Sequence, residues 1–121
     1  MPSDTMKANL AELLQELDPI LMNPKRFMIA TLLYTIGGMT MGELRKSLGI
    51  NWGDLDTHLR RLAENGYIEL WREPGKHKGL EVKVYLSELG RKKYEELGEK
   101  LKGLLEKIFF KDSPILTDYS L

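Results

Sequence analysis

The stretch MTMGELRKSLGINWGDLDTHLRRLAENG, residues 39–66, decides the fold. It reads as two short helices joined by a tight turn. Thr40 followed three residues later by Glu43 has the capping-box spacing for the first helix, and Gly49 ends that helix. Asn51 is suited to cap the second helix, which closes at the end of the stretch. A helix, a glycine-containing turn and a second capped helix form the helix-turn-helix pattern.

Both helices carry an apolar side. The leucines at helical spacing are Leu44 and Leu48 in the first helix and Leu55, Leu59 and Leu62 in the second. A rotation of 100° per residue then places Gly53, Thr57 and Arg60 on the opposite side of the second helix, flanked by Asp56 and Arg61. In a helix-turn-helix the second helix can lie in the major groove of DNA, so we expect a recognition helix at residues 51–65.

Composition sets limits on the function. A chain of 121 residues with 42% apolar and 30% charged residues is typical of one globular domain. The absence of cysteine excludes disulfides, thiolate metal sites and a cysteine nucleophile. No apolar run approaches the ~20 residues of a membrane span and no signal-peptide pattern opens the chain, so a cytoplasmic location without a membrane partner is expected.

The charge balance argues against an indiscriminate nucleic-acid binder. The chain has 18 basic and 18 acidic residues, whereas non-specific DNA affinity comes mainly from neutralised phosphates. A DNA-binding face must therefore arise from local placement of charge. Lys and Glu supply most of the charges, a bias that is compatible with an archaeal or thermophilic source.

Helices are also expected before the central stretch. Apolar periodicity predicts an N-terminal helix over 5–18. Its stripe consists of Met6, Leu10, Leu13, Leu14 and Leu17. This stripe can pack on the domain's own core or on a dimer partner, and the sequence leaves both open. Asn23-Pro24 has the N-cap and first-position chemistry of a further helix that ends at Gly37-Gly38.

After Gly66 the pattern changes from helical to alternating. The positions that would face the core from two strands are Ile68, Leu70, Val82, Val84 and Leu86. Residues 73–80, here called the wing, connect the strands and carry Lys76, His77 and Lys78 at their tip. Helices followed by a hairpin with a basic loop predict a winged helix, a mostly α protein with a small β-hairpin (α+β).

A last helix is predicted over 87–110, with Ser87 as its cap. Its heptad-like seam consists of Tyr94, Leu97, Leu101, Leu104 and Ile108. We expect this helix and the N-terminal helix to form a dimer interface. The predicted organisation is one winged-helix domain over 1–110, with the helix-turn-helix and wing at 23–86, followed by a tail at 111–121.

Four strings resemble a known family when they are taken in order. They are LMNPKRFMIATLL (21–33), MGELRKSLGI (41–50), LDTHLRRLAENGYIE (55–69) and VYLSELGRKKYEEL (84–97). The chain resembles small single-domain winged-helix transcriptional regulators of the ArsR/MarR kind. The resemblance implies a homodimer, built by the terminal helices, that binds an imperfect palindrome in a promoter. Metal-sensing members use cysteine or histidine clusters, which this chain lacks.

The start of the recognition helix departs from that family. Small or amide residues are frequent there, whereas this chain has Trp52, Asp54 and Asp56. Asp54 is suited to the positive end of the helix dipole, and Asp56 can accept from cytosine N4 or repel phosphate. Trp52 is expected to pack beneath the turn rather than to stack on a sugar. His58 borders the apolar stripe and is expected to be a core histidine with a hydrogen-bond partner.

DNA contacts are predicted on the second helix and the wing. Arg60 and Thr57 are expected to read base edges, since arginine can bond bidentately to guanine. The alternative for Arg60 is an exposed ion pair with Asp56 one turn earlier. The alternative for the wing is a solvated loop. The full predicted set is Thr40, Asn51, Gly53, Asp56, Thr57, Arg60, Arg61, Lys76, His77 and Lys78.

Three classes of function compete. The first is a homodimeric regulator that binds double-stranded DNA at a promoter, with a small-molecule effector left open. The second is a winged-helix module that binds protein instead of DNA, because fold alone does not decide function. The third is an enzyme, for which the sequence offers no phosphate-binding loop and no convincing catalytic pair. No catalytic residue, metal ligand or cofactor is predicted.

Overall fold

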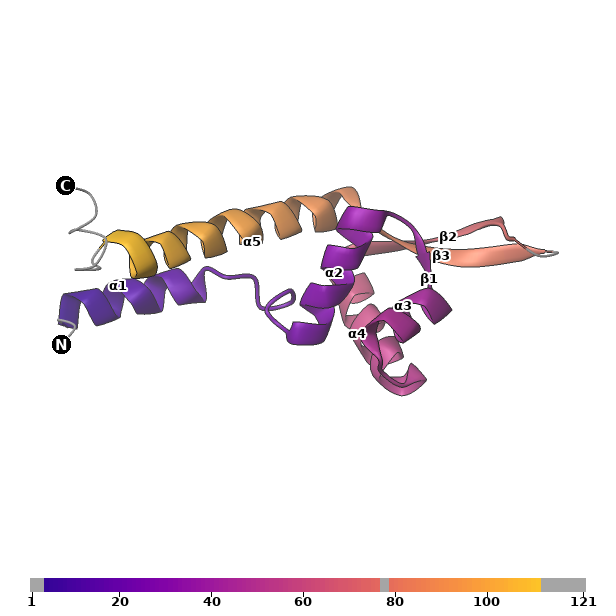
Figure 1. Cartoon of the computed structure of the whole chain (residues 1–121), viewed down its shortest axis with the longest axis horizontal. Helices are drawn as coiled ribbons and strands as arrows, with labels where there is room; N and C mark the ends of the chain where they lie inside the picture. Colours follow the sequence, from indigo (N-terminus) through magenta and orange to yellow (C-terminus); the bar gives the residue numbers. More distant parts are fainter. Residues whose placement is uncertain (1–3, 77–78, 112–121) are drawn as a thin grey trace. The chain divides into compact units, whose positions relative to one another are not determined.

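The computed structural model describes residues 4–76 and 79–111. They fall into two compact units, Pro19–Tyr94 and a second made of residues 4–18 and 95–111. The elements of the described chain are α1 (Asp4–Gln15), α2 (Pro24–Ile36), β1 (Met39–Thr40), α3 (Met41–Leu48), α4 (Trp52–Glu64), β2 (Ile68–Pro74), β3 (Leu80–Leu86), α5 (Glu88–Glu106) and a π-helical turn (Lys107–Lys111), shown in Figure 1. This is the predicted α+β winged helix, with one additional strand.

Helix α2 begins and ends where the local chemistry requires. The Asn23 side chain accepts hydrogen bonds from the backbone N–H groups of Lys25 and Arg26, each at 3.1 Å. Pro24 occupies the first turn, where its missing N–H has no intrahelical partner to lose. Gly37 ends the helix with φ 97°, a conformation that favours glycine. The predicted limits of this helix are confirmed.

The core of the unit Pro19–Tyr94 is formed by the apolar sides of its helices. Its buried members include Ile29, Ala30 and Leu33 of α2, Leu44 and Leu48 of α3, Leu55, Leu59 and Leu62 of α4, and Ile68 and Val84 of the strands. All five leucines predicted from helical spacing in α3 and α4 are buried. Burial of a leucine stabilises the fold by about 1.5–3 kcal/mol, so these positions hold the two helices of the motif together.

The sheet has three antiparallel strands in the order β1-β3-β2. The two-residue strand β1 was not predicted, and it pairs Met39 with Val84 and Thr40 with Lys83. Gly38 precedes it, and a Cβ at Gly38 would lie 2.6 Å from the hydroxyl oxygen of Tyr85 and closer still to the ring. Glycine therefore lets the chain pass tightly beside β3.

The expectation that Leu70 and Val82 face the core is wrong. Their side chains are 54% and 38% exposed, although Leu70 lies opposite the fully buried Val84. Leu70 lies on β2, an edge strand of the sheet, and Val82 lies farther along the hairpin than Val84. In Figure 1 the far ends of β2 and β3 extend past α3. Only the base of the hairpin therefore has helices to pack against.

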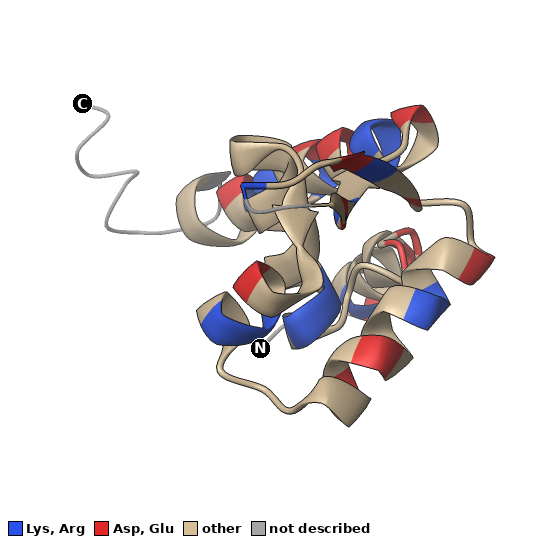
Figure 2. Cartoon of the chain, turned by 90° about the vertical axis from the view of Figure 1, so that its right-hand side faces the viewer, with Lys and Arg blue, Asp and Glu red and all other residues tan. Residues whose placement is uncertain are grey.

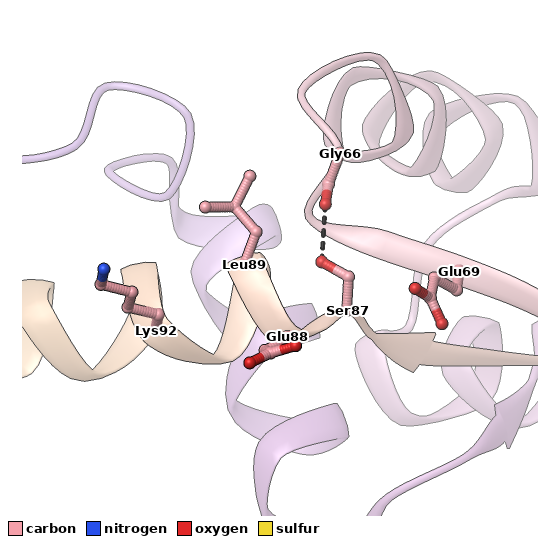
Figure 3. A pocket seen from close by; sticks show the side chains of 6 residues that line it. All are labelled: Gly66, Glu69, Ser87, Glu88, Leu89 and Lys92. Carbon is pink, nitrogen blue, oxygen red and sulfur yellow. Dashed lines mark hydrogen bonds between the residues drawn. The ribbon is translucent and has the colours of Figure 1, made fainter.

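Ser87 joins the start of α5 to the turn after α4 (Figure 3). Its hydroxyl donates to the carbonyl oxygen of Gly66 at 2.6 Å and accepts from the N–H of Gly90 at 2.9 Å. The Ser87 N–H donates to the carbonyl oxygen of Tyr67 at 3.0 Å. A Cβ at Gly90 would lie 2.8 Å from the Tyr67 carbonyl carbon and closer to its oxygen. Ser87 thus caps α5, as predicted, and Gly90 permits this close approach.

The second unit pairs α1 with the C-terminal part of α5, which lie side by side in Figure 1. The Lys100 ammonium donates to the carbonyl oxygen of Glu16 at 3.2 Å. The predicted helix over 5–18 ends earlier, at Gln15, because the chain tightens there and the Leu17 N–H donates to Leu14 three residues back. The predicted helix over 87–110 is α5 followed by the π-helical turn. Apart from Lys111, the predicted tail lies outside the described residues, and the single domain over 1–110 stays a prediction.

Replacing Thr40 by alanine should lower the free energy of unfolding by about 1 kcal/mol, the usual contribution of an N-cap hydroxyl. The Thr40 hydroxyl accepts from the Glu43 N–H, and the Glu43 carboxylate accepts from the Thr40 N–H, each at 3.1 Å. The hydrogen bond from the Thr40 backbone N–H, followed by the Thr40 side chain, holds the pKa of the Glu43 carboxyl below its ordinary value. Urea denaturation measures the change, and Thr40→Ser is the control because it keeps the hydroxyl. Equal losses in both variants would contradict the capping box.

Candidate nucleic-acid interface

The turn between α3 and α4 is set by its own residues. Gly49 adopts φ 65°, and its N–H donates to the carbonyl oxygens of Arg45 at 2.9 Å and Lys46 at 3.3 Å. This left-handed cap is the usual way for a helix to end in glycine. The Asn51 side chain then accepts from the Asp54 N–H at 2.8 Å and starts α4. Three residues thus connect two capped helices, as predicted.

Helix α4 presents one polar side to solvent. Gly53, Thr57 and Arg60, here called the outer face, are all exposed. The Thr57 hydroxyl donates to the Gly53 carbonyl oxygen at 3.0 Å, which leaves its oxygen available as an acceptor. Asn51 and Arg61, two further predicted contact residues, are also exposed. The helix therefore buries its leucines and exposes the residues that were predicted to meet DNA.

Arg60 pairs with Asp56 in this structure. The guanidinium and carboxylate are 2.6 Å apart, and both side chains are about two-thirds exposed, at 68% and 65%. This is the alternative that the sequence left open for Arg60. An exposed i,i+4 pair contributes only about 0.3–0.5 kcal/mol. The bond therefore sets the resting position of Arg60 without preventing a stronger contact.

Trp52 does not pack beneath the turn, and that expectation is wrong. Its side chain, at the first position of α4, is 57% exposed. The guanidinium carbon of Arg45 in α3 lies 5.0 Å from the ring centroid, within cation–π range. Neither Trp52 nor Arg45 is in the predicted set of DNA contacts. The signal available in the sequence was the large apolar residue at the start of a recognition helix.

His58 lies on the side of α4 that faces α2 and is half-buried. Its Nδ1 is 3.3 Å from a guanidinium nitrogen of Arg26, whose Nε donates to the Ile20 carbonyl oxygen at 2.5 Å. Arginine only donates, so Nδ1 must accept and the ring is neutral with its proton on Nε2. Burial, then the charges of Arg26 and Lys25, lower the pKa of His58, and Asp54 opposes them. The prediction of a partnered histidine is confirmed.

The stability of the protein should fall as the pH falls from about 7 to 5. Because the pKa of His58 is lowered in the folded state, the unfolded chain takes up the proton first, near the ordinary value of about 6.5. The stabilisation is present above that pH and is lost as the pH falls toward the lowered pKa. Urea denaturation at several pH values measures the slope. His58→Gln keeps an acceptor for Arg26 and should flatten the profile, and an unchanged slope would contradict this assignment.

The loop between β2 and β3 is shorter than the predicted connection over residues 73–80. Strand β2 continues to Pro74 and β3 begins at Leu80, so residues 75–79 alone connect them, and the Gly75 N–H donates to the Gly79 carbonyl oxygen at 3.1 Å. Cross-strand pairing of Glu73 with Glu81 and Pro74 with Leu80 extends the hairpin into the predicted loop. Lys76 is exposed, whereas the predicted contacts His77 and Lys78 lie outside the described residues.

Glu73 anchors one face of the hairpin. Its carboxylate accepts a hydrogen bond from the Tyr85 hydroxyl and lies 3.5 Å from the Lys83 ammonium. The hydrogen bond to Glu73 raises the pKa of Tyr85. Thr40, a predicted contact residue, pairs with Lys83 in the sheet. The interactions of Glu73 with β3 therefore support the wing, and the pairing of β1 with β3 links it to the start of α3.

Charges of both signs intermix on this side of the chain. Figure 2 shows Lys and Arg segments of the ribbon beside Asp and Glu segments. An open hollow elsewhere in the unit Pro19–Tyr94 is lined by Gly66, Glu69, Ser87, Glu88, Leu89 and Lys92 (Figure 3).

Within residues 4–76 and 79–111 no three His, Asp or Glu side chains gather as metal ligands. Over the same ranges no helix is both long and apolar enough to span a membrane.

The predicted dimer residues differ in burial. Leu17, Leu97 and Leu104 are buried within the chain, and Leu10, Leu13 and Leu101 are half-buried. Leu14 and Ile108 remain 55% and 49% exposed. Further exposed apolar residues of this unit are Met6, Leu105, Phe109 and Phe110. The unit made of residues 4–18 and 95–111 thus has both a buried seam and an exposed apolar surface.

Comparison with known proteins supports the fold. No protein-family model matches the chain. Over 87 residues, 72% of this chain, it is 31% identical to the uncharacterized HTH-type transcriptional regulator YwoH of Bacillus subtilis (strain 168). The matched region spans 61% of the length of that relative.

Solved structures give the same result. A transcriptional regulator homologue from Pyrococcus horikoshii OT3 superimposes with a TM-score of 0.71 and 22% identity, over 85% of this chain and 99% of that one. The homodimeric winged helix-turn-helix DNA-binding domain of a possible ArsR-family transcriptional regulator from Mycobacterium bovis gives a TM-score of 0.61 and 23% identity, over 87% and 92% of the two chains. The predicted winged-helix fold is confirmed, and the structural neighbours are winged-helix transcriptional regulators.

Proposed function

We propose, from a winged-helix fold whose structural neighbours are transcriptional regulators, that this chain is a sequence-specific regulator that binds double-stranded DNA. It acts as a homodimer on a promoter and controls access of the polymerase. Helix α4 enters the major groove, and the wing lies on the minor groove or on its phosphates. The relative from Bacillus subtilis supports this proposal only over the matched region, which is 61% of its length.

The observation that carries this proposal is the exposed outer face of a helix that is capped at its start. Arg60 can exchange its ion pair with Asp56 for two hydrogen bonds to guanine. The pair contributes about 0.3–0.5 kcal/mol, whereas a bidentate contact with guanine contributes about 1–3 kcal/mol of discrimination. The exchange therefore favours DNA. Thr57, one turn from Gly53 on the same face, supplies its hydroxyl oxygen as an acceptor for a donor on a base edge.

Dimerisation is inferred from the apolar surface of the unit made of residues 4–18 and 95–111. Leu14 and Ile108 stay about half exposed there, and apolar patches of this kind usually mark interfaces. The homodimeric domain from Mycobacterium bovis supports the same assembly. Two recognition helices related by a two-fold axis would lie about 34 Å apart, so half-sites should be centred about one helical turn apart.

Leu14→Glu should convert the dimer to a monomer, because a carboxylate at the interface loses its hydration without gaining a partner. Sedimentation velocity measures the mass, and circular dichroism checks the fold. Leu70→Glu is the matched control, since Leu70 is 54% exposed on β2 and Leu14 is 55% exposed on α1. A dimer that survives Leu14→Glu, or a wild-type monomer, would contradict the proposed interface.

Selection of bound sequences from random duplex DNA tests the function as a whole. The expected result is a palindrome with half-sites about one turn apart and an affinity that falls steeply with salt. Footprinting on the selected site should show protection phased with the helical repeat. Failure to enrich any sequence at low salt would overturn the proposal.

A second candidate function is a winged-helix module that binds protein. The Asp56–Arg60 pair and the intermixed charges in Figure 2 favour it, because neither helps to attract phosphate. Affinity capture with the full chain distinguishes the two functions. One stoichiometric protein partner, with no DNA enriched in the selection, would favour the module.

A further inference from the structure

The exposed indole at the start of α4 has no role in the fold described above. Trp52 is the first residue of α4 and is 57% exposed, although it is the largest apolar side chain of that helix. One contact of the ring is with the Arg45 guanidinium, 5.0 Å from its centroid. An exposed tryptophan held on one side by a cation is suited to bind something on its open side.

Arg45 is itself incompletely satisfied. Its Nε is buried, and within the described part of the chain it has no hydrogen-bond partner. No carboxylate among the described residues forms an ion pair with Arg45 within 4.0 Å. A buried donor without a partner lowers the stability of the fold, so this arrangement is not explained by stability alone. The guanidinium lies beside the start of α4 and can meet an anion there.

The position of Trp52 indicates the ligand. The N-terminal residues of a recognition helix contact base edges in the major groove. Trp52, Asp56 and Arg60 follow one another at four-residue intervals, so they lie along one line of the helix that meets the outer face at Arg60. The apolar group that bases present in the major groove is the C5-methyl of thymine. An apolar ring on this line therefore matches a thymine, and the adjacent cation matches a phosphate.

We infer that Trp52 is a specificity-determining residue that packs against the C5-methyl of a thymine in each half-site. Arg45 positions the indole and neutralises the neighbouring phosphate. This inference rests on the proposed function, and its ligand is duplex DNA. Tryptophan and arginine are also frequent in protein–protein hot spots, but the line shared with Arg60 and the cation without a carboxylate favour DNA.

The test replaces thymine by deoxyuridine, which removes only the methyl group. The full chain is first used to select its site from random duplexes, and each thymine of that site is then replaced in turn. At one thymine per half-site the wild-type affinity should fall about fourfold, as expected for one buried methyl-sized group. Trp52→Ala should weaken binding to the thymine site by about tenfold or more and abolish the thymine–deoxyuridine difference.

Two variants separate this contact from general effects. Trp71→Ala removes an indole that is 56% exposed on β2, and it should keep the fourfold difference at the same thymine. Arg45→Met keeps the length of the side chain but removes its charge. It should weaken binding to all sequences and lower the slope of log affinity against log salt by about one.

The outcomes are separable. If the selected half-sites contain no thymine, this inference is wrong and the proposed function is intact. The same holds if Trp52→Ala still binds thymine more tightly than deoxyuridine at the selected site. Failure to select any duplex would overturn both. If Trp52→Ala binds DNA like the wild type but loses a protein partner, the indole serves a protein interface and the inference is wrong.

Discussion

Replacing Gly90 by alanine should lower the free energy of unfolding by at least about 2 kcal/mol, because overpacking against backbone is not easily relieved. A Cβ at this position would lie 2.8 Å from the Tyr67 carbonyl carbon and closer to its oxygen. That carbonyl cannot move away without cost, since it accepts from the Ser87 N–H at 3.0 Å and the Ser87 hydroxyl holds Gly66 at 2.6 Å. Urea denaturation at a fixed protein concentration measures the change.

Gly98→Ala, in the same helix, is the matched control. Apart from its chain neighbours and the nearby backbone of its own helix, no atom of the described chain lies within 4 Å of a Cβ built at Gly98. Alanine should therefore raise the free energy of unfolding by up to about 1 kcal/mol through helix propensity alone. The two glycines of α5 are predicted to respond with opposite signs. A similar response at both positions would mean that the contact between Gly90 and Tyr67 is not rigid.

Replacing Arg60 by alanine should weaken binding to the selected site by about 10- to 100-fold, the range expected when a bidentate contact with guanine is lost. Preference at one base pair should relax, whereas binding to unrelated duplexes should change little. Competition titrations with single-base variants of the site measure both effects. If Arg60→Ala keeps the wild-type order of preference at every position, then Arg60 does not read a base.

Asp56→Asn separates the ion pair from the contact with DNA. It removes the charge that holds Arg60 at 2.6 Å and lowers the repulsion of phosphate. Affinity should therefore rise for all sequences while the preference at the Arg60 position is kept. If Asp56→Asn instead loses a preference for cytosine at one position, then Asp56 reads that cytosine, the role that the sequence left open.

Local chemistry explains why most of the helix-turn-helix could be predicted from residue order. Thr40 and Asn51 cap their helices through backbone groups three residues away, and Gly49 adopts φ 65° at the turn. Each signal and its partner lie within a few positions, so no long-range information is needed. The leucine spacing of α4 likewise decides which side of the helix is buried, and this leaves the outer face exposed to solvent.

The features that escaped prediction depend on groups far apart in the chain. Strand β1 exists because residues 39–40 pair with residues 83–84, and two residues carry no strand pattern of their own. The exposure of Leu70 follows from its place on an edge strand, which alternation cannot reveal. Glycine is needed at position 90 because the carbonyl group of Tyr67 lies close to it. The exposed ring of Trp52 contacts the guanidinium of Arg45 on the preceding helix. Residue order specifies the helices, their caps and their apolar sides, whereas packing between distant segments decides which of the remaining side chains meet solvent.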